Sequence, residues 1–267
     1  MENTQFYKGV IDAPGCVSNG WNLIKPNYWM YFGIGVLVVL SPLILSCIPC
    51  LNILLVGPLS SVLTAGIYYV LLRDMRGEPV EFSMMFKGFE NLVPILVVGV
   101  IQAIPSMMFQ ALQWVLDLGR LAAQLSRGAR GNGNFYQSEE AGIAITAGLI
   151  ALSIAVAILI IIFSIAWAIT FEFAIPLVIE QNLGPIEAIK LSARAGWSNI
   201  GGLIVLMLIE GLIVIAGFLA ICIGMFFVFP VVFAAKAFAY RQVFPLLNQT
   251  FQTVPPPNQH GGFAQGM

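Results

Sequence analysis

Residues 141–179 decide the fold, and they read AGIAITAGLIALSIAVAILIIIFSIAWAITFEFAIPLVI. Glu172 is the one charged residue in this run. As a helix it would extend about 58 Å at about 1.5 Å per residue, whereas the hydrocarbon core of a bilayer is about 30 Å thick. Two short spans would also fit this length. No turn signal interrupts the run before Pro176, so the pattern favours one long, tilted membrane helix.

The composition of the whole chain agrees with a membrane protein. Of its 267 residues, 59% are hydrophobic and only 9% are charged, whereas a soluble domain carries about 25% charged residues. This excludes a soluble globular protein, a disordered protein and a nucleic-acid-binding protein. The net charge of −1 provides no field that would attract a charged partner. The single histidine, His260, lies in a polar tail, so no metal site and no cofactor are expected.

Further runs of about 20 mostly apolar residues identify the other spans. The fold predicted is an all-α, six-span transmembrane helical bundle over residues 28–245. A cytoplasmic N-terminus with an interfacial helix precedes it (residues 1–27), with no cleavable signal peptide. A tail that is disordered by composition follows it (residues 246–267). The predicted spans are residues 28–48, 51–72, 92–118, 141–179, 200–222 and 225–244.

The basic residues predict the orientation of the spans, because cytoplasmic connections are enriched in Lys and Arg. Eight lie on one side of the predicted bundle and three on the other. Both termini are therefore expected in the cytoplasm. The eight are Lys8, Lys25, Arg73, Arg76, Lys87, Lys190, Arg194 and Arg241, and the three are Arg120, Arg127 and Arg130.

A short pattern occurs three times, each time just before an odd-numbered span. It consists of a β-branched aliphatic residue, an acid, six to eight further residues, then Gly and an aromatic residue. We interpret each copy as an amphipathic helix in the inner membrane interface, and predict three repeats of such a helix plus two spans. Parallel repeats of this kind pack around an axis along the membrane normal. The copies are Ile11-Asp12 to Gly20-Trp21, Val80-Glu81 to Gly88-Phe89, and Ile186-Glu187 to Gly196-Trp197.

Two of these stretches also carry a resemblance to known families. The runs GEPVEFSMMFKGF (residues 77–89) and GPIEAIKLS (residues 184–192) resemble uncharacterised bacterial polytopic inner-membrane protein families. Among these are the membrane domains attached to glycerophosphodiester phosphodiesterases. The resemblance implies a bacterial inner (plasma) membrane and six spans. It implies no reaction, because the chain has no soluble phosphodiesterase domain.

Glu172, Glu210 and Lys236 form a candidate intramembrane charge cluster, because all three lie inside predicted spans. Charges at this depth are costly, and they mark either a paired structural cluster or a path for ions or solutes. Lys236 lies on the span adjacent to that of Glu210. We therefore expect these two side chains to face each other, with the lysine stem extended toward the carboxylate.

Three cysteines are candidate outer-face thiols. Cys47 and Cys50 form a C-x-x-C pair, and Cys222 takes the place of Cys50 in the third repeat. Such pairs occur in thiol oxidoreductases, where one thiolate attacks and the other resolves. No basic residue lies close by, so structural thiols or a passive disulfide are favoured. Repeat symmetry would bring Cys50 and Cys222 toward the bonding range of about 5.5–6 Å between Cα atoms.

These patterns favour a non-enzymatic integral membrane protein, either a membrane scaffold or a lipid-facing accessory. One alternative is a small-solute or ion transporter or channel that uses Glu172, Glu210 and Lys236. A second alternative is a membrane thiol-disulfide oxidoreductase. The partner expected is the lipid bilayer, together with a protein partner that the sequence does not identify; no nucleic acid is expected.

Overall fold

The computed structural model describes residues 6–46, 49–129, 139–219 and 223–245, and within these ranges every regular element is a helix. This confirms the all-α prediction. The helices are α1 (Ala13–Ile24), η1 (Lys25–Asn27), α2 (Tyr28–Ser46), α3 (Pro49–Asp74), η2 (Phe82–Phe89), α4 (Leu92–Gln102), α5 (Ile104–Ala129), α6 (Glu139–Phe171), α7 (Ala174–Gln181), α8 (Pro185–Ser198), α9 (Ile200–Leu219) and α10 (Ile223–Val243).

Several of these helices fit a multi-pass membrane protein. In the described part of the chain, four helical stretches are long and apolar enough to cross a membrane. A fifth would be the pair η2 and α4, which is bent by 80°. The count of six spans stays a prediction. The four stretches are Ala13–Ser41, Ala151–Gln181, Ile200–Leu219 and Gly224–Val243.

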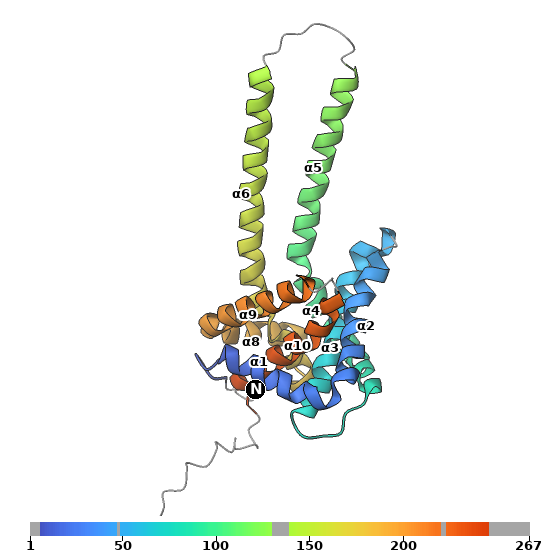
Figure 1. Ribbon diagram of the computed structural model, residues 1–267, viewed down its shortest axis with the longest axis vertical. Coiled ribbons are helices and arrows are strands. Elements are labelled where there is room, and N and C mark those ends of the chain that lie inside the picture. Colours follow the sequence, from blue (N-terminus) through green and yellow to red (C-terminus); the bar gives the residue numbers. More distant parts are fainter. Residues whose placement is uncertain (1–5, 47–48, 130–138, 220–222, 246–267) are drawn as a thin grey trace, which may run out of the picture.

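The helices form a compact body from which α5 and α6 project side by side as a long hairpin (Figure 1). The predicted span 92–118 is divided between these two parts, since α4 ends at Gln102 and α5 begins at Ile104. Pro105 explains the division, because proline has no N–H and its ring displaces the carbonyl of the residue four positions earlier. The predicted third span is therefore two helices, of which α4 belongs to the body.

The predicted helix over residues 141–179 is also interrupted. α6 ends at Phe171 and α7 begins at Ala174, so Glu172 and Phe173 lie in a break. Pro176 follows four residues after Glu172, the distance at which a proline ring clashes with a helical carbonyl. α7 and residues 151–171 of α6 still lie within one candidate span, Ala151–Gln181.

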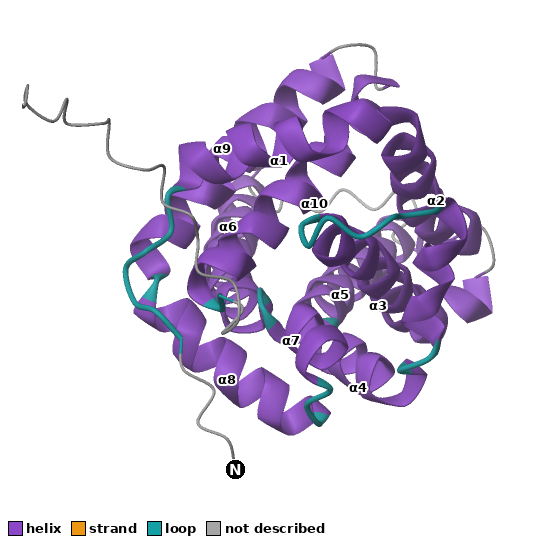
Figure 2. Ribbon diagram, turned by 90° about the horizontal axis from the view of Figure 1, so that it is seen from below, coloured by secondary structure: helices purple, strands orange, loops and turns teal. Residues whose placement is uncertain are grey.

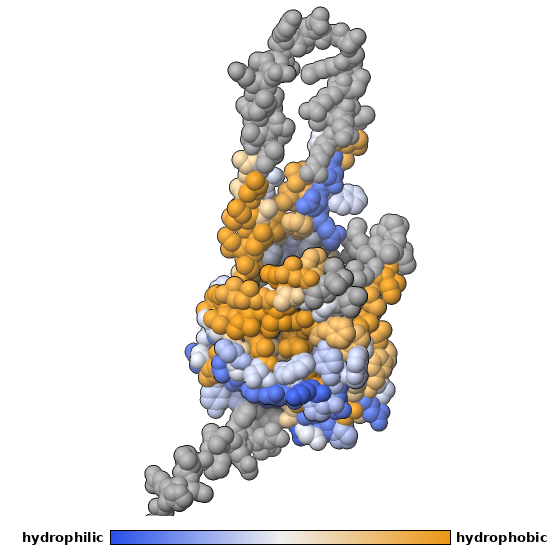
Figure 3. All heavy atoms as spheres, in the orientation of Figure 1, coloured by the Kyte–Doolittle hydropathy of each residue, from blue (hydrophilic) through white to orange (hydrophobic). Residues whose placement is uncertain are grey.

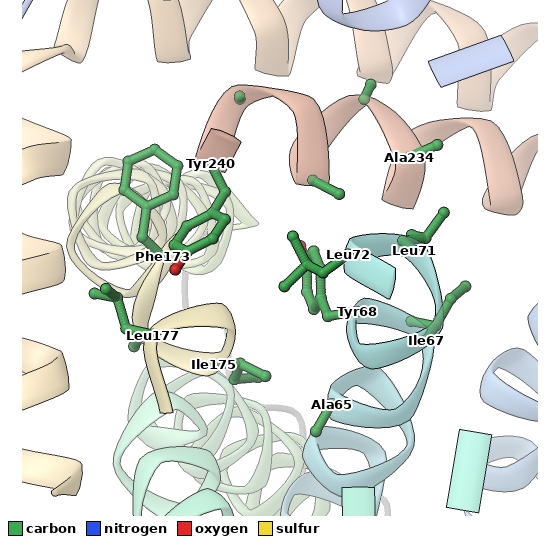
Figure 4. Packing of buried hydrophobic residues seen from close by; sticks show 14 of the residues in the cluster. Ala65, Ile67, Tyr68, Leu71, Leu72, Phe173, Ile175, Leu177, Ala234 and Tyr240 are labelled. Carbon is green, nitrogen blue, oxygen red and sulfur yellow. The ribbon is translucent and has the colours of Figure 1, made fainter. Parts of the chain in front are cut away.

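The core of the body lies between α3, α7 and α10. Figure 2 shows these three helices near the centre of the body, with the other helices around them. In Figure 4, Tyr240 of α10 lies beside Phe173, and Tyr68 and Leu72 project from α3 toward α7. Tyr68 and Leu72 come from α3, Phe173 and Leu177 from α7 and the break before it, and Tyr240 from α10. Each of the three predicted repeats thus contributes one helix to the core.

The three predicted amphipathic stretches form α1, η2 and α8, whose most extensive contacts are with α10, α3 and α6, respectively. A buried glycine lies at each contact, where an added Cβ would come closer than 3.0 Å to backbone atoms of the neighbour. Only glycine permits so close an approach. Gly20 meets Ala235 of α10, Gly88 meets Val62 of α3, and Gly196 meets Ile169 of α6.

Candidate functional site: a buried charge cluster

Lys236 of α10 brings together the three charged residues singled out from the sequence. Its Nζ donates a hydrogen bond to Glu172 Oε1 at 2.7 Å and lies 3.6 Å from Glu210 Oε2. Both carboxylates therefore lie within ion-pair range of one ammonium group. Glu210 and Lys236 thus face each other as the adjacent spans predicted, but the hydrogen bond of the lysine goes to Glu172.

The cluster is largely shielded from the surroundings. The side chains of Glu172 and Glu210 are 7% and 9% exposed, and that of Lys236 is 22% exposed. Buried charges of this kind are tolerated when they are paired, and removing one partner leaves the other uncompensated. The pairing therefore ties α10 to the α6–α7 break and to α9.

The break between α6 and α7 determines where Glu172 lies. Ser192 of α8 is fully buried and bridges the break, because its Oγ accepts a hydrogen bond from Phe173 N–H at 3.1 Å and donates one to the Thr170 carbonyl at 2.7 Å. Backbone groups released by a helix interruption inside a membrane need such partners. The sequence analysis did not identify Ser192, although its position in the third amphipathic stretch was a usable signal.

The small residues of α10 allow the helix that carries Lys236 to pack closely with its neighbours. Ala234, Ala235, Ala237 and Ala239 are all fully buried. Small side chains are typical of helix contacts in membranes, where close packing replaces the hydrophobic effect. Lys236 is thus held on a helix that has little freedom to shift.

A second set of charges lies about 8–12 Å from the first, judged from about 1.5 Å of rise per residue along α7 and α10. Arg241 donates two hydrogen bonds to Glu180, at 2.7 and 3.1 Å. Arg76, which follows α3, lies 3.7 Å from the same carboxylate. The second set therefore joins the ends of the three core helices with the bidentate geometry that makes Arg–carboxylate pairs strong. From the sequence, Arg76 and Arg241 were recognisable only as orienting charges, because their shared partner Glu180 is distant from both along the chain.

The candidate thiols cannot be placed in the same way. Cys47 and Cys222 lie outside the described residues, as does the side chain of Cys50. The expected approach of Cys50 to Cys222 stays a prediction. Cys16, which the sequence analysis did not single out, is a buried free cysteine on α1.

The geometry limits what the cluster can do chemically. No group of three or more His, Cys, Asp or Glu side chains in the described ranges could hold a metal ion. With all three groups charged, one lysine and two glutamates carry one excess negative charge. Glu210 Oε1 is buried, and it has no hydrogen-bond partner among the described residues. The arrangement can therefore hold helices together, and its one unpartnered oxygen could accept a proton.

Comparisons with known proteins add no family: the chain matches no protein-family model, no curated protein and no solved structure.

Proposed function

We propose that this protein is a non-enzymatic, six-span protein of the bacterial inner membrane that acts as a membrane scaffold or lipid-facing accessory. The observation that carries the proposal is the hairpin of α5 and α6. Trp114, Val115 and Leu159 are each about two-thirds exposed, at 65–66%, and the described side chains of α6 are mostly apolar on the face seen in Figure 3. An apolar surface of this extent needs lipid or protein around it.

The pairing of the charges supports a scaffold more than a path for solutes. Lys236 is engaged by both carboxylates, and Glu180 is engaged by Arg241. Groups that conduct ions or bind solutes must exchange partners, whereas these five residues hold together the helices that bear them. The body is thus suited to carry the hairpin rigidly.

The contacts of α1, η2 and α8 support the proposed threefold repeat. α1 packs on α10, η2 on α3 and α8 on α6, so each amphipathic helix contacts the second span of the preceding proposed repeat, in cyclic order. Three equivalent glycines lie at these contacts. We propose that the repeats surround an axis along the membrane normal, with both termini in the cytoplasm.

A transporter or channel is the second candidate, and the unpartnered Glu210 Oε1 favours it. A carboxylate with a free oxygen inside a membrane protein is typical of proton-coupled sites. This candidate would place the functional centre in the charge cluster and make the hairpin secondary.

Proteoliposomes distinguish the two candidates. We expect vesicles containing the wild-type protein to be no more permeable to protons, Na⁺ or K⁺ than protein-free vesicles. A flux that requires the wild-type protein, and that is lost in Glu210→Gln while Lys87→Met retains it, would establish the transporter and overturn the scaffold. Lys87 is a suitable control because it pairs with Glu90 on the surface.

A further inference from the structure

The exposed face of α8 carries two basic residues between two large apolar residues. Ile186, Lys190, Arg194 and Trp197 are all exposed, and they are separated by four, four and three residues. Residues three and four apart lie on one face of a helix. Ile186 and Trp197 are 53% and 51% exposed. This face therefore combines positive charge with an apolar side chain at each end.

A third exposed basic residue, Lys8, is held at the C-terminal end of α8. Asn199, which caps α8 and is 2% exposed, accepts a hydrogen bond from Val10 N–H at 3.2 Å and donates one to the Tyr7 carbonyl at 3.0 Å. Gly9 has a φ of +66°, a conformation that glycine adopts readily, and this lets the segment turn. Figure 2 shows the N-terminal segment passing beside α8 at the edge of the body. We define the α8 basic surface as Lys8, Ile186, Lys190, Arg194 and Trp197.

The basic residues of this surface have no acidic partner in the structure. Lys8, Lys190 and Arg194 form no ion pair with any residue in the described ranges. Glu187, the acid of α8, lies in its first turn, where a carboxylate stabilises the helix dipole. The α8 basic surface therefore carries positive charge that is not neutralised. By contrast, the basic residues of the predicted cytoplasmic side that do form ion pairs are Arg73, Arg76, Lys87 and Arg241.

We propose that the α8 basic surface binds the headgroup of an anionic phospholipid on the cytoplasmic side of the membrane. The proposal rests on the lipid-facing role given under the proposed function, and it adds the class of lipid. Ammonium and guanidinium groups both bind phosphate, and a guanidinium group can do so through two parallel hydrogen bonds. Lys190 and Arg194 are four residues apart on one face, so both can reach one phosphate group.

The apolar residues at the two ends favour a lipid over a soluble anion. Tryptophan is enriched at membrane interfaces, where its ring lies at the level of the headgroups. The ring of Trp197 is held in place, because its Nε1 donates a hydrogen bond to Thr170 Oγ1 at 3.2 Å. Helices with basic residues beside exposed Trp and aliphatic side chains are typical of binding to anionic membranes. A soluble phosphate offers no apolar group to Ile186 or Trp197, whereas a phospholipid offers acyl chains.

The other two amphipathic elements provide an internal contrast. In η2, the exposed Lys87 pairs with Glu90, so its charge is neutralised. Phe86 and Phe89 are exposed there, at 51% and 41%, so η2 offers apolar contact without net positive charge. Lys25, which follows α1, is a single exposed base. The preference for an anionic lipid is therefore expected at α8.

Titration of the full chain with lipids in a mild detergent, followed by native mass spectrometry, tests the proposal. The probes are phosphatidylglycerol, which is anionic, and phosphatidylcholine, which has no net charge. The wild type is expected to bind the first phosphatidylglycerol molecule more tightly than the first phosphatidylcholine molecule. Lys190→Gln and Arg194→Gln combined should weaken phosphatidylglycerol binding about 25-fold, at about fivefold for each basic residue, and leave phosphatidylcholine binding unchanged. Equal affinity of the wild type for both lipids, or unchanged phosphatidylglycerol affinity in the double variant, would overturn the proposal.

Matched variants separate a binding surface from a general effect of charge. Lys8→Gln should weaken phosphatidylglycerol binding about fivefold, whereas Lys25→Gln, which also removes one exposed charge, should leave it unchanged. Equal losses in these two variants would show that only the net charge matters, and would overturn the proposal. Ile186→Ser should weaken binding without any change of charge. Inorganic phosphate should not displace the lipid; displacement would identify a soluble anion as the ligand and would also overturn the proposal.

Failure of this proposal is distinguishable from failure of the proposed function. Proteoliposomes that stay impermeable, together with no preference for phosphatidylglycerol, would remove the lipid-binding surface and leave the scaffold. A flux that requires the wild-type protein, together with a preference for phosphatidylglycerol that is lost in the double variant, would remove the scaffold and support the lipid-binding surface.

Discussion

A single lysine links three helical segments of the body. Lys236 contacts Glu172 in the α6–α7 break and Glu210 of α9 from its own position on α10. In a low-dielectric interior each of these charges depends on its partner. Loss of the lysine would leave two buried carboxylates close together, whereas loss of one carboxylate would leave a simple ion pair.

Replacement of Lys236 by Met is therefore expected to lower the free energy of unfolding by about 3–5 kcal/mol, the cost of breaking a buried pair. Adding Glu172→Gln should recover more of this loss than adding Glu210→Gln, because the lysine bonds to Glu172. Reversible unfolding in mixed micelles would measure both effects. Equal recovery by the two glutamine variants would contradict the ranking of the partners. Lys87→Met, which breaks an exposed pair, should leave stability unchanged.

Sequence could identify the members of the cluster but not its geometry. Charged residues stand out in apolar runs, so Glu172, Glu210 and Lys236 were recognisable without coordinates. The shorter contact of Lys236, to Glu172, depends on the helix break. Ser192 bridges this break, and it lies 19 residues after Phe173 in the chain. Counting helical rise along a single span cannot predict a contact that depends on a residue of another helix.

At the scale of elements, prolines explain the breaks between successive helices, and glycines explain where two helices approach each other closely. Pro105 and Pro176 end the regular helices ahead of them. Sequence placed the amphipathic stretches correctly, since α1, η2 and α8 form there. It could not show which helix each one packs against, because that depends on contacts between residues distant in the chain.

The equivalent glycines give a prediction for three elements together. Gly20→Ala, Gly88→Ala and Gly196→Ala should each lower stability by about 1–3 kcal/mol, because the new methyl group would overlap backbone of the neighbouring helix. Gly211→Ala is the matched control, since nothing lies within 4 Å of an added Cβ there. That control should be neutral or stabilising by up to about 1 kcal/mol from helix propensity. Thermal unfolding of the four variants would test the equivalence, and a neutral Gly196→Ala would refute it.

The bridge over the α6–α7 break gives a second prediction. Ser192→Ala removes the partner of both Phe173 N–H and the Thr170 carbonyl. Two buried backbone groups without partners should cost about 2–6 kcal/mol, at about 1–3 kcal/mol each. Ser164→Ala is the control, because that hydroxyl bonds only to the Ile160 carbonyl within its own helix. Hydrogen exchange at Phe173 should accelerate in Ser192→Ala and stay unchanged in Ser164→Ala.

At the scale of the whole molecule, the charged and the apolar surfaces are separated. The side of the body away from the hairpin is hydrophilic, and an apolar belt lies above it (Figure 3). The ion pairs of Arg73, Arg76 and Glu78 are all partly exposed, as expected for residues in the last turn of a core helix or just beyond it. Arg73 and Arg76 are two of the basic residues from which a cytoplasmic side is predicted.

Labelling of single cysteines from outside the cell would test this orientation. Cysteines at positions 87 and 190, which are exposed, should react only after the membrane is permeabilised. A cysteine at position 130, which sequence places in the outer connection, should react in intact cells. Position 260 should behave like position 87. Labelling of position 87 in intact cells would refute the proposed topology.

The contact between the first and last helices closes the body into a ring. α1 packs on α10, Tyr7 N–H bonds to the Val243 carbonyl at 3.0 Å, and Asp12 N–H bonds to Gln242 Oε1 at 2.9 Å. The ribosome makes α1 before α10, so α1 has no partner at this contact until all the helices between them have been synthesised. Completion of the body is thus a late, long-range closure of the kind that slows folding. During synthesis, the face of α1 that carries Gly20 therefore stays without its contact to Ala235 until α10 has been made.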